Sequence, residues 1–475
     1  MNGRILLIQA PEYLIGKKTI PTEDFLGLSY PPLGLAYIAA MLLENGWQTK
    51  IIDPVPQNLS SPQILVEIKK FAPDFIGLTA TTPTFPKALT LAKKIKRKFP
   101  QIVTIIGGPH VTAAPIQTMK NPFFDFAVLG EGEETIIELL SHLKRKKEGD
   151  EKIPGIAFKK NGKVIIAASR PYIKNLDKIP FPARKLLPPL SFYHPNPGTY
   201  KNLPAASMIT SRGCPFKCTF CDRAVFGNQV RFRSPKNVVD EIEMLVKEYG
   251  AREIRVWDDI FNLDPNRVIE ICKEILKRKL IFSWTCLARV NFVNLRMLRW
   301  MKKAGCWQIS YGIESGNQEI LNKIKKGLTL EMVREVVKKT HQAGIEVKGF
   351  FMLGLPGDTK KTIQQTINFA KSLDIDIATF SITTPFPGTE IYQEVKNIPQ
   401  FKRVDFSHYL PYYPTSLSYV PAGLNQKTLL EFEKKAHFEF YLRPRYIFRE
   451  LVKIRSFFDF WSKTKAFLRL LKHWI

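Results

Sequence analysis

Cysteine is scarce in this chain and unevenly distributed. The 475 residues contain six cysteines, and none of them precedes Cys214. Six cysteines without a regular spacing do not form a disulfide framework, so we expect a reducing compartment, the cytoplasm. Long apolar runs are also lacking. No stretch of about 18 uncharged apolar residues occurs, so we expect no membrane-spanning helix. The apolar part of residues 1–8 is too short for a signal peptide and predicts a first strand instead.

Acidic residues are few relative to basic ones. The chain has 43 Asp and Glu against 71 Lys and Arg, a formal net charge of +28. Much of the excess is lysine, as in residues 93–98, where a solvated helix face is a sufficient explanation. A field this positive favours a polyanionic neighbour, either nucleic acid or an anionic membrane. Charge alone does not choose between them.

Three of the six cysteines lie close together. Cys214, Cys218 and Cys221 follow the apolar run 205–209 in C-x3-C-x2-C spacing. A short loop can turn three thiolates at this spacing toward one point, which suits an iron–sulfur cluster, usually held by four. Three ligands would leave one iron open to a substrate or cofactor. The alternative, a zinc knuckle, needs a fourth Cys or His nearby, and the nearest histidine, His194, lies across a proline-rich stretch.

The segment 211–222 resembles the signature of the radical S-adenosylmethionine (SAM) enzymes. Phe220, directly before the third cysteine, also matches the family pattern. The resemblance implies a [4Fe-4S] cluster on Cys214, Cys218 and Cys221 whose open iron chelates SAM. It implies reductive cleavage of SAM to a 5′-deoxyadenosyl radical, and therefore a low-potential electron donor such as ferredoxin or flavodoxin.

Residues 1–150 alternate short apolar runs with helical stretches. We expect strands at 4–9, 48–52, 75–78, 102–106 and 126–129, with the clearest helices at 34–44, 83–98 and 133–146. Such alternation predicts an α/β fold with a doubly wound, Rossmann-like parallel sheet. Ligands of these sheets lie at the carboxyl ends of strands. Small residues stand at those ends here, although glycines there can simply make tight turns.

Three segments of this first domain, 31–37, 107–110 and 130–133, resemble the cobalamin-binding domain that precedes many radical SAM modules. The resemblance implies that cobalamin is contacted by Thr79, Thr81, Gly107, Gly108, His110, Gly130, Glu131 and Gly132. The Asp-x-His-x-x-Gly signature of a lower axial ligand is absent, since none of the seven histidines has Asp two positions earlier. We therefore expect cobalamin without a histidine ligand, or a domain that kept its fold and lost the cofactor. A lone histidine such as His110 is also typical of a loop hydrogen bond.

Residues 151–202 predict a connector. It begins with a β-hairpin at 156–166, turning at Asn161-Gly162, and continues through a proline-rich stretch. Residues 203–395 then predict a (β/α)6 partial TIM barrel, the fold of the family. The expected strands are 205–210, 253–257, 282–288, 308–312, 346–352 and 377–382, with helices at 234–249, 266–278, 295–304, 330–343 and 360–373.

Polar and small residues again follow the barrel strands, where functional residues of barrels collect. By resemblance, SAM is contacted by Phe220, Asp258, Asp259, Arg289, Glu314, Ser315, Leu353 and Pro356. Asp258 and Asp259 would bind its amino group and Arg289 its carboxylate. We expect Asp264 to cap a helix and Cys272, Cys286 and Cys306 to pack in the core. No residue is assigned to catalysis itself.

Residues 396–475 predict a loop and a helical, basic, amphipathic tail. From Phe440 onward nine Lys and Arg face two acids, interleaved with aromatic residues and leucine. This pattern fits an anionic membrane surface, and it fits equally a terminal helix packed on the barrel. We expect a cytoplasmic protein, in peripheral contact with the inner face of the membrane through this tail in the first case.

Domain order and the stretch 441–446 resemble the anaerobic porphyrin-cyclase-like and hopanoid-associated branch of the family. The resemblance implies a radical SAM enzyme that methylates an unactivated carbon of a hydrophobic or lipid-like small molecule with the help of cobalamin. Cobalamin-free cyclisation or carbon–carbon coupling is the alternative reaction, and a non-catalytic iron–sulfur or cobalamin-binding regulatory module the alternative class. A tRNA methylthiotransferase would carry a further cysteine trio before Cys214, so nucleic acid is not the expected partner.

Overall fold

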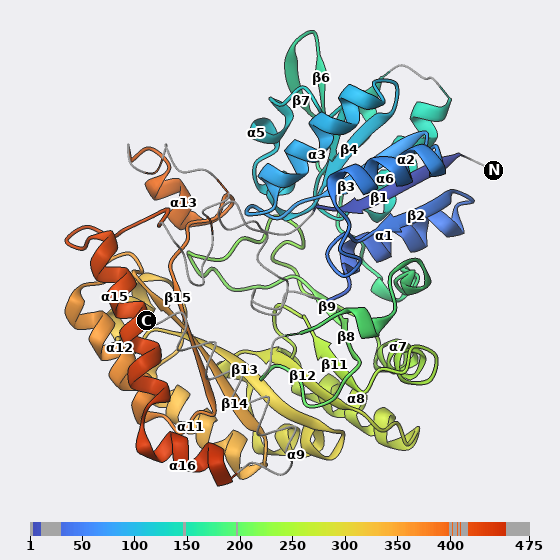
Figure 1. The fold of residues 1–475 in the computed structure, drawn as a ribbon. Coiled ribbons are helices and arrows are strands. Elements are labelled where there is room, and N and C mark those ends of the chain that lie inside the picture. Colours follow the sequence, from blue (N-terminus) through green and yellow to red (C-terminus); the bar gives the residue numbers. More distant parts are fainter. Residues whose placement is uncertain are drawn as a thin grey trace.

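Two α/β units, one amino-terminal and one carboxy-terminal, make up the protein (Figure 1). The computed structural model describes residues 3–10, 30–145, 149–195, 198–398 and 417–452, together with Phe401, Phe406 and Tyr409. The tail from residue 453 onward and most of the loop 409–414 lie outside the described residues. No helix in the described ranges is both long enough and apolar enough to cross a bilayer.

The amino-terminal sheet has the order β2-β1-β3-β4-β5-β6-β7 in the described residues. Its strands are β1 (Arg4–Gln9), β2 (Gln48–Ile52), β3 (Phe75–Thr79), β4 (Val103–Gly107), β5 (Phe126–Val128), β6 (Ile156–Lys160) and β7 (Lys163–Ile166). β1 to β5 are parallel. Their apolar residues are buried on both faces, as in Ile5, Leu6, Leu7 and Ile8, which is typical of a parallel sheet covered by helices on both sides.

Helices cover both faces of this sheet. They are α1 (Leu33–Glu44), α2 (Ser61–Phe71), α3 (Phe85–Lys98), α4 (Pro109–Ala113), α5 (Pro115–Met119) and α6 (Gly132–Lys144). α1 and α6 share one apolar core, and α2 and α3 share the other. The strand order reverses between β1 and β3, which is where doubly wound sheets bind ligands. The predicted doubly wound fold is confirmed.

The predicted hairpin forms, but its place differs from the prediction. Asn161 and Gly162 adopt φ of 51° and 75°, the left-handed conformations of a tight hairpin turn. β6 pairs antiparallel with β5, so the hairpin extends the amino-terminal sheet. The sequence placed it in the connector after residue 150, because local periodicity reveals a hairpin without revealing which edge it joins.

The carboxy-terminal unit is a six-stranded parallel sheet, within the described part, of order β15-β14-β13-β12-β11-β8. Its strands are β8 (Ala205–Met208), β11 (Glu253–Val256), β12 (Ser283–Ala288), β13 (Cys306–Glu314), β14 (Glu346–Leu353) and β15 (Ile377–Ile382). The principal helices are α7 (Pro235–Lys247), α8 (Pro265–Lys277), α9 (Leu295–Lys303), α10 (Gln318–Lys323), α11 (Leu330–Gln342) and α12 (Lys360–Ser372). The predicted partial barrel is confirmed.

Alternation along the barrel strands separates two faces. Ile254, Cys286 and Val347 pack with the helices on the outer face, in one core with Cys272 and Cys306, as predicted for the three solitary cysteines. Their neighbours Arg255 and Lys348 point to the opposite side, which we call the inner face. Asp264 caps α8 as expected, since its carboxylate accepts from the amides of Asn266 and Arg267.

Two helices of the tail follow the barrel. α15 (Gln426–Tyr441) packs against β15 and α12, and the Tyr441 hydroxyl donates to the Ala378 carbonyl at 2.6 Å. α16 (Pro444–Val452) continues from it (Figure 1). α13 (Glu390–Val395) lies apart from these, near the junction of the two units.

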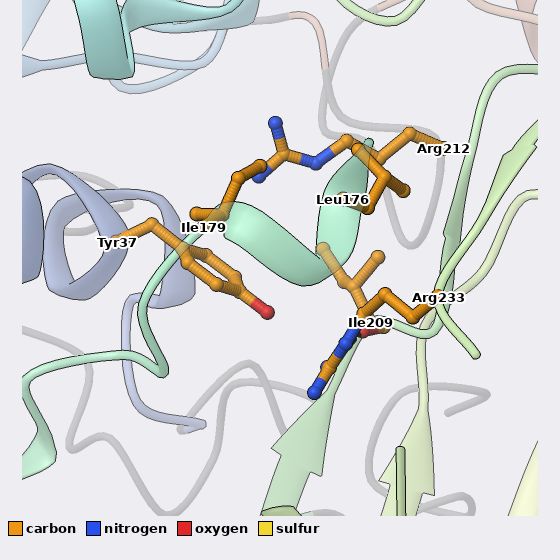
Figure 2. A pocket seen from close by; sticks show the side chains of 6 residues that line it. All are labelled: Tyr37, Leu176, Ile179, Ile209, Arg212 and Arg233. Carbon is orange, nitrogen blue, oxygen red and sulfur yellow. Dashed lines mark hydrogen bonds between the residues drawn. The ribbon is translucent and has the colours of Figure 1, made fainter. Parts of the chain in front are cut away.

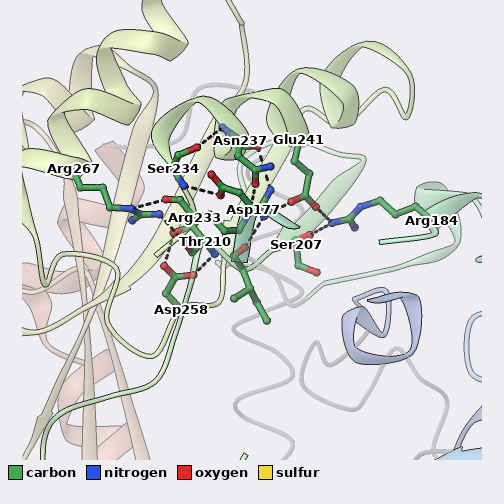
Figure 3. Close-up of polar contacts among 11 residues, drawn as sticks. Asp177, Arg184, Ser207, Thr210, Arg233, Ser234, Asn237, Glu241, Asp258 and Arg267 are labelled. Carbon is green, nitrogen blue, oxygen red and sulfur yellow. Dashed lines mark hydrogen bonds and ion pairs between the residues drawn. The ribbon is translucent and has the colours of Figure 1, made fainter. Parts of the chain in front are cut away.

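A buried charge network anchors the first barrel strand (Figure 3). Glu241 of α7 is fully buried and accepts from Arg184 of the connector at 2.7 Å and from Arg233 at 2.5 Å. Burial raises the pKa of Glu241, but the two guanidinium groups lower it by more, so it falls below its usual range. Arg267 of α8 donates to the Thr210 carbonyl at 2.8 Å. The chain leaving β8 toward the three cysteines is therefore held from two helices and from the connector.

Candidate functional site

The three cysteines lie on a loop with a closed base. Residues 213–230, which we call the cluster loop, leave β9 (Ser211–Arg212) and return through β10 (Arg231–Phe232), and these two short strands pair antiparallel. Gly213 has φ of 94°, and a Cβ there would stand 2.3 Å from the Gln229 carbonyl oxygen. Only glycine fits at this point, so the start of the loop is fixed directly before Cys214.

The donor set fits an iron–sulfur cluster better than a single ion. Cys218 is buried, Cys214 is half-buried and Cys221 is exposed. Within the described ranges no three His, Cys, Asp or Glu side chains converge on one metal ion, which a zinc knuckle would require. A cubane instead takes one thiolate for each iron, so its ligands stand further apart. Cys214, Cys218 and Cys221 would hold the cluster.

Asp258 holds the strand end that leads into the cluster loop. It is 1% exposed, and its carboxylate accepts from the Thr210 amide at 2.6 Å and from the Ser211 hydroxyl at 2.7 Å, besides the Thr210 hydroxyl. The sequence predicted that Asp258 binds the amino group of SAM. In the structure the carboxylate is buried and its oxygens have donors within the protein, and the SAM contact stays a prediction.

Asp259 faces the other way and is exposed. Burial raises the pKa of the Cys214 thiol, and the negative charge of Asp259 adds to the rise, so this carboxylate lies near the cysteine. Of the two predicted aspartates, Asp259 is therefore the more accessible candidate for the SAM amino group.

Arg289 lies beside the cluster loop at the end of β12. Its Nη1 is 3.7 Å from the Cys218 sulfur, and its guanidinium lies over the Phe216 ring, 3.6 Å from the centroid. Asn262 fixes the backbone of Arg289 by donating to its carbonyl at 2.9 Å and accepting from its amide at 2.8 Å. A cation beside a sulfur favours the thiolate that an iron needs. Whether Arg289 also pairs with the SAM carboxylate stays a prediction.

Glu314 is paired with a lysine that the sequence reasoning missed. Its carboxylate is 2.7 Å from Lys326 Nζ, and both side chains are buried. Glu314 adopts φ of 72°, a strained conformation that non-glycine residues usually keep for functional sites. Lys326 also lies over the ring of Phe220, 5.5 Å from the centroid. The ion pair therefore lies beside Phe220, the residue directly before Cys221. The sequence contains no motif that would have predicted the pairing of Glu314 with Lys326.

The remaining predicted SAM residues have packing roles. The Ser315 hydroxyl is 3.2 Å from the Thr366 hydroxyl of α12. Leu353 is fully buried in the barrel core. Pro356 lies in a turn that Asp358 closes by accepting from the Leu355 amide at 2.8 Å. The structure thus gives these three side chains no free polar group for a cofactor.

In the amino-terminal unit, the residues predicted to contact cobalamin lie at or just after the carboxyl ends of neighbouring strands. Thr79 of β3 is in register with Gly107 of β4, so the two lie side by side at the carboxyl edge of the sheet. Gly108 has φ of 106°, and a Cβ there would stand 2.7 Å from the Thr79 hydroxyl. This glycine is needed for the close approach of the two strand ends. Thr81 forms a local turn in which its amide donates to the Thr84 hydroxyl at 2.9 Å.

His110 is buried within the same unit. Its Nδ1 is 3.2 Å from the Thr82 hydroxyl, and its ring packs between Phe85 and Phe406, with centroids 4.2 and 4.8 Å away. Burial lowers the pKa of His110 to about 4, so the ring is neutral. These surroundings agree with the alternative given from the sequence, a histidine that makes a hydrogen bond within a loop, and not with a metal ligand.

Four buried charged residues join the two units. The Glu131 carboxylate accepts from Arg212 at 2.8 Å and from Arg231 at 2.7 Å, and Glu133 accepts from Arg212 at 2.5 Å. We call Glu131, Glu133, Arg212 and Arg231 the clamp. Burial lowers the pKa of Arg212, but Glu133 and Glu131 raise it by more, so the guanidinium stays charged. Glu131 also accepts from the Ile173 amide at 2.8 Å, so its carboxylate is engaged at the base of the cluster loop, and its predicted contact with cobalamin stays a prediction.

The glycines beside the clamp pack closely. The Gly130 amide donates to the Thr112 hydroxyl at 3.0 Å, and a Cβ at Gly132 would stand 3.1 Å from Ile38. Figure 2 shows a small pocket beside Arg212, one of the clamp residues, with Tyr37 of α1 on its other side. There Tyr37, Leu176, Ile179, Ile209, Arg212 and Arg233 line a void of about 10 Å³. A void of this size holds about one water molecule, so these six side chains pack closely around it.

Comparison with known proteins agrees with this arrangement. Residues 208–370 match the model of the radical SAM superfamily, and residues 26–140 match that of the B12 binding domain. The chain is 37% identical over 457 residues to an uncharacterized methyltransferase of Pyrococcus horikoshii, covering 96% of each chain. It belongs to the radical SAM enzymes that carry a B12-binding domain.

Two further similarities extend this assignment. The anaerobic magnesium-protoporphyrin IX monomethyl ester cyclase of Rubrivivax gelatinosus is 32% identical over 374 residues, covering 77% of this chain and 66% of the relative. The radical SAM methyltransferase TsrM of Kitasatospora setae, solved with cobalamin and a [4Fe-4S] cluster, has a TM-score of 0.73 at 16% identity, covering 100% of this chain and 99% of that one. The latter supports the fold. The predicted cofactors, a [4Fe-4S] cluster, SAM and cobalamin, are confirmed at the level of the family.

Removal of any one cluster cysteine is expected to abolish the cluster. We expect Cys218→Ala, reconstituted with iron and sulfide without oxygen, to lose the broad visible absorption of a [4Fe-4S] cluster and its content of about four irons. The matched control is Cys272→Ala, which removes a buried sulfur from the same unit and should keep the cluster. Retention of a full cluster by Cys218→Ala would contradict the assignment of this ligand.

Proposed function

We propose that this enzyme methylates an unactivated carbon of a small hydrophobic or lipid-like molecule, with cobalamin as the methyl carrier. The observation that carries the proposal is the clamp. It fixes the base of the cluster loop to the segment that follows β5, so the three cysteines and the carboxyl edge of the amino-terminal sheet belong to one site. The methyltransferase name of the Pyrococcus horikoshii relative, which matches nearly the whole chain, points to the same reaction.

When bound, SAM and the cluster supply a carbon-centred radical that abstracts hydrogen, and cobalamin supplies a methyl group. The residues of this chain orient and shield that chemistry. Arg289 and Asn262 hold a positive charge beside Cys218, and the buried pair of Glu314 and Lys326 stabilises the wall next to Phe220. Asp259 offers an exposed carboxylate near Cys214 for the SAM amino group.

The test is cobalamin retention followed by methyl transfer. Protein purified without oxygen and reconstituted with iron and sulfide should retain about one equivalent of hydroxocobalamin after desalting, visible as corrin absorbance. The enzyme is then supplied with a low-potential reductant and with SAM whose methyl group is deuterated. The methylated product should contain three deuterium atoms. Complete loss of corrin from a protein with an intact cluster would overturn the methylation proposal and favour cobalamin-free cyclisation or coupling.

Two partners complete the proposal. We propose a low-potential ferredoxin or flavodoxin as electron donor, because reductive cleavage of SAM requires one. We also propose that the tail makes peripheral contact with a membrane. The described end of that tail supports the second idea, because Ile447, Phe448 and Val452 of α16 are exposed near Arg445. A basic helix with an exposed apolar side binds anionic lipid surfaces.

Membrane contact predicts a dependence on lipid charge. In flotation with vesicles, the whole protein should bind phosphatidylserine-containing membranes and release them in high salt, whereas protein ending at residue 442 should stay unbound. Equal flotation of the two proteins would contradict the role of the tail.

A further inference from the structure

The inner face of the barrel carries a row of polar residues. Arg255 of β11 is in register with Ser207 of β8 on one side and with Thr285 of β12 on the other. Thr285 is in register with Gln308 of β13. Residues in register on parallel strands point to the same side of the sheet. Lys348 of β14 belongs to the same inner face, in register with Ser310. Barrel interiors are usually filled by apolar branched side chains, so this row is unusual.

Two cations on this face have no carboxylate partner. Arg255 is 5% exposed and Lys348 is 9% exposed. Neither side chain makes an ion pair among the described residues. Burial lowers the pKa of Arg255, and the Tyr30 hydroxyl, which lies beside it, raises that pKa against the effect of burial. Each cation also lies over an aromatic ring, with Trp257 4.3 Å from the Arg255 guanidinium and Phe350 5.3 Å from Lys348 Nζ. Burial, and then the charge of Arg255, lower the pKa of Lys348 to about 7. Buried lysine and arginine are almost always paired in folded proteins.

The nearest acid on the same strand is already engaged. Glu253 accepts from the Trp307 indole at 2.8 Å and from the Lys201 amide at 3.2 Å, and it also accepts from the Ser283 hydroxyl. Burial raises the pKa of Glu253, although these donors lower it. Its carboxylate makes no ion pair with Arg255 or Lys348 among the described residues, although its charge raises the pKa of Arg255 slightly against the effect of burial.

Five buried polar atoms on or beside this inner face lack a direct hydrogen-bond partner within the part of the chain that the structure describes. They are Tyr30 Oη, Ser207 Oγ, Arg255 Nε, Thr285 Oγ1 and Gln308 Oε1. Four of these groups can donate a hydrogen bond. Tyr30 comes from the amino-terminal unit and meets the barrel edge-on at Trp257, with ring centroids 5.9 Å apart. Donors from both units thus surround the two cations.

Buried cations without an ion pair, next to hydroxyl donors without a partner, are typical of a site that binds an anion. We propose that Arg255 and Lys348 bind an oxyanion group of the substrate, a phosphoryl, phosphonyl or carboxylate group, with hydroxyl donors from Tyr30, Ser207 and Thr285. Arg255 stands three residues before Asp258, so an anion held here lies just inside the strand ends that carry the cluster loop and Asp259. A planar guanidinium and an ammonium suit such a group, because both give charge-assisted hydrogen bonds.

This proposal deepens the proposed function by naming one chemical group of the substrate, and its test needs neither SAM nor turnover. The protein with its reconstituted cluster is heated in chloride, acetate or inorganic phosphate of equal ionic strength, and the apparent melting temperature is recorded. The variants are Lys348→Met, which keeps the side-chain length and removes the charge, and Lys361→Met, an exposed lysine of α12 as the matched control. Arg255→Gln is the second variant of the site.

We expect phosphate or acetate to raise the melting temperature of the wild type and of Lys361→Met by about 2 °C more than that of Lys348→Met and Arg255→Gln. General salt stabilisation affects all four proteins and cancels in this difference. The anion with the larger difference identifies the oxyanion class. In chloride, Lys348→Met should melt above the wild type, because it loses an unpaired buried charge.

Equal shifts in all four proteins would overturn the proposal. So would a lower melting temperature of Lys348→Met in chloride, since that result would show Lys348 to be a paired structural residue. Either outcome leaves the methylation proposal standing, because that proposal is judged by corrin retention and methyl transfer. Loss of corrin with a preserved anion effect would conversely refute methylation alone.

Discussion

The structure depends on one buried electrostatic contact, the clamp of Glu131 and Glu133 with Arg212 and Arg231. Breaking such a pair from one side leaves an uncompensated buried charge and costs about 3–5 kcal/mol. Arg212 immediately precedes the glycine that starts the cluster loop, and Arg231 is its partner in the two-stranded ribbon that closes the loop. The same four side chains therefore fix the loop geometry and dock it on the amino-terminal unit. The cofactor-bearing parts of the two units meet through this contact.

Most of the buried charged residues around the cluster loop and the barrel have partners of opposite charge or hydroxyl donors. Glu241, Glu131, Glu133, Asp258 and Glu314 are all buried, and each has one or more cationic or hydroxyl donors. Arg255 and Lys348 are the exceptions on the inner face of the barrel, where neither cation forms an ion pair among the described residues and the carboxylate of Glu253 is engaged by other donors. A paired charge supports the fold, whereas an unpaired one raises the energy of the free protein and is relieved by a ligand. This contrast separates the structural charges from the substrate-binding ones.

The sequence predicted the fold well because it depends on local signals. Strand–helix alternation placed both parallel sheets, and Asn161-Gly162 placed a hairpin, with strand ends differing by one or two residues. The cysteine spacing identified the cluster loop. The protein partners of Asp258 and Glu131 could not be predicted from the sequence. A carboxylate after a strand has the same local pattern whether it binds a cofactor, a neighbouring strand end or, like Glu131, an arginine 81 positions away. Lys326, Asn262 and the unpaired Lys348 had no local signal, since their roles follow from tertiary partners.

The central claim, that the clamp brings the cluster loop and the cobalamin domain into one site, is tested most directly by electron paramagnetic resonance. Protein loaded with cluster and cob(II)alamin is measured with the cluster oxidised and with the cluster reduced. The account predicts that the cob(II)alamin signal broadens or relaxes faster when the neighbouring cluster becomes paramagnetic. Arg212→Gln should weaken this effect, whereas Arg252→Gln, a change at an exposed arginine, should preserve it. A cobalamin signal indifferent to the cluster's oxidation state in the wild type would contradict the account.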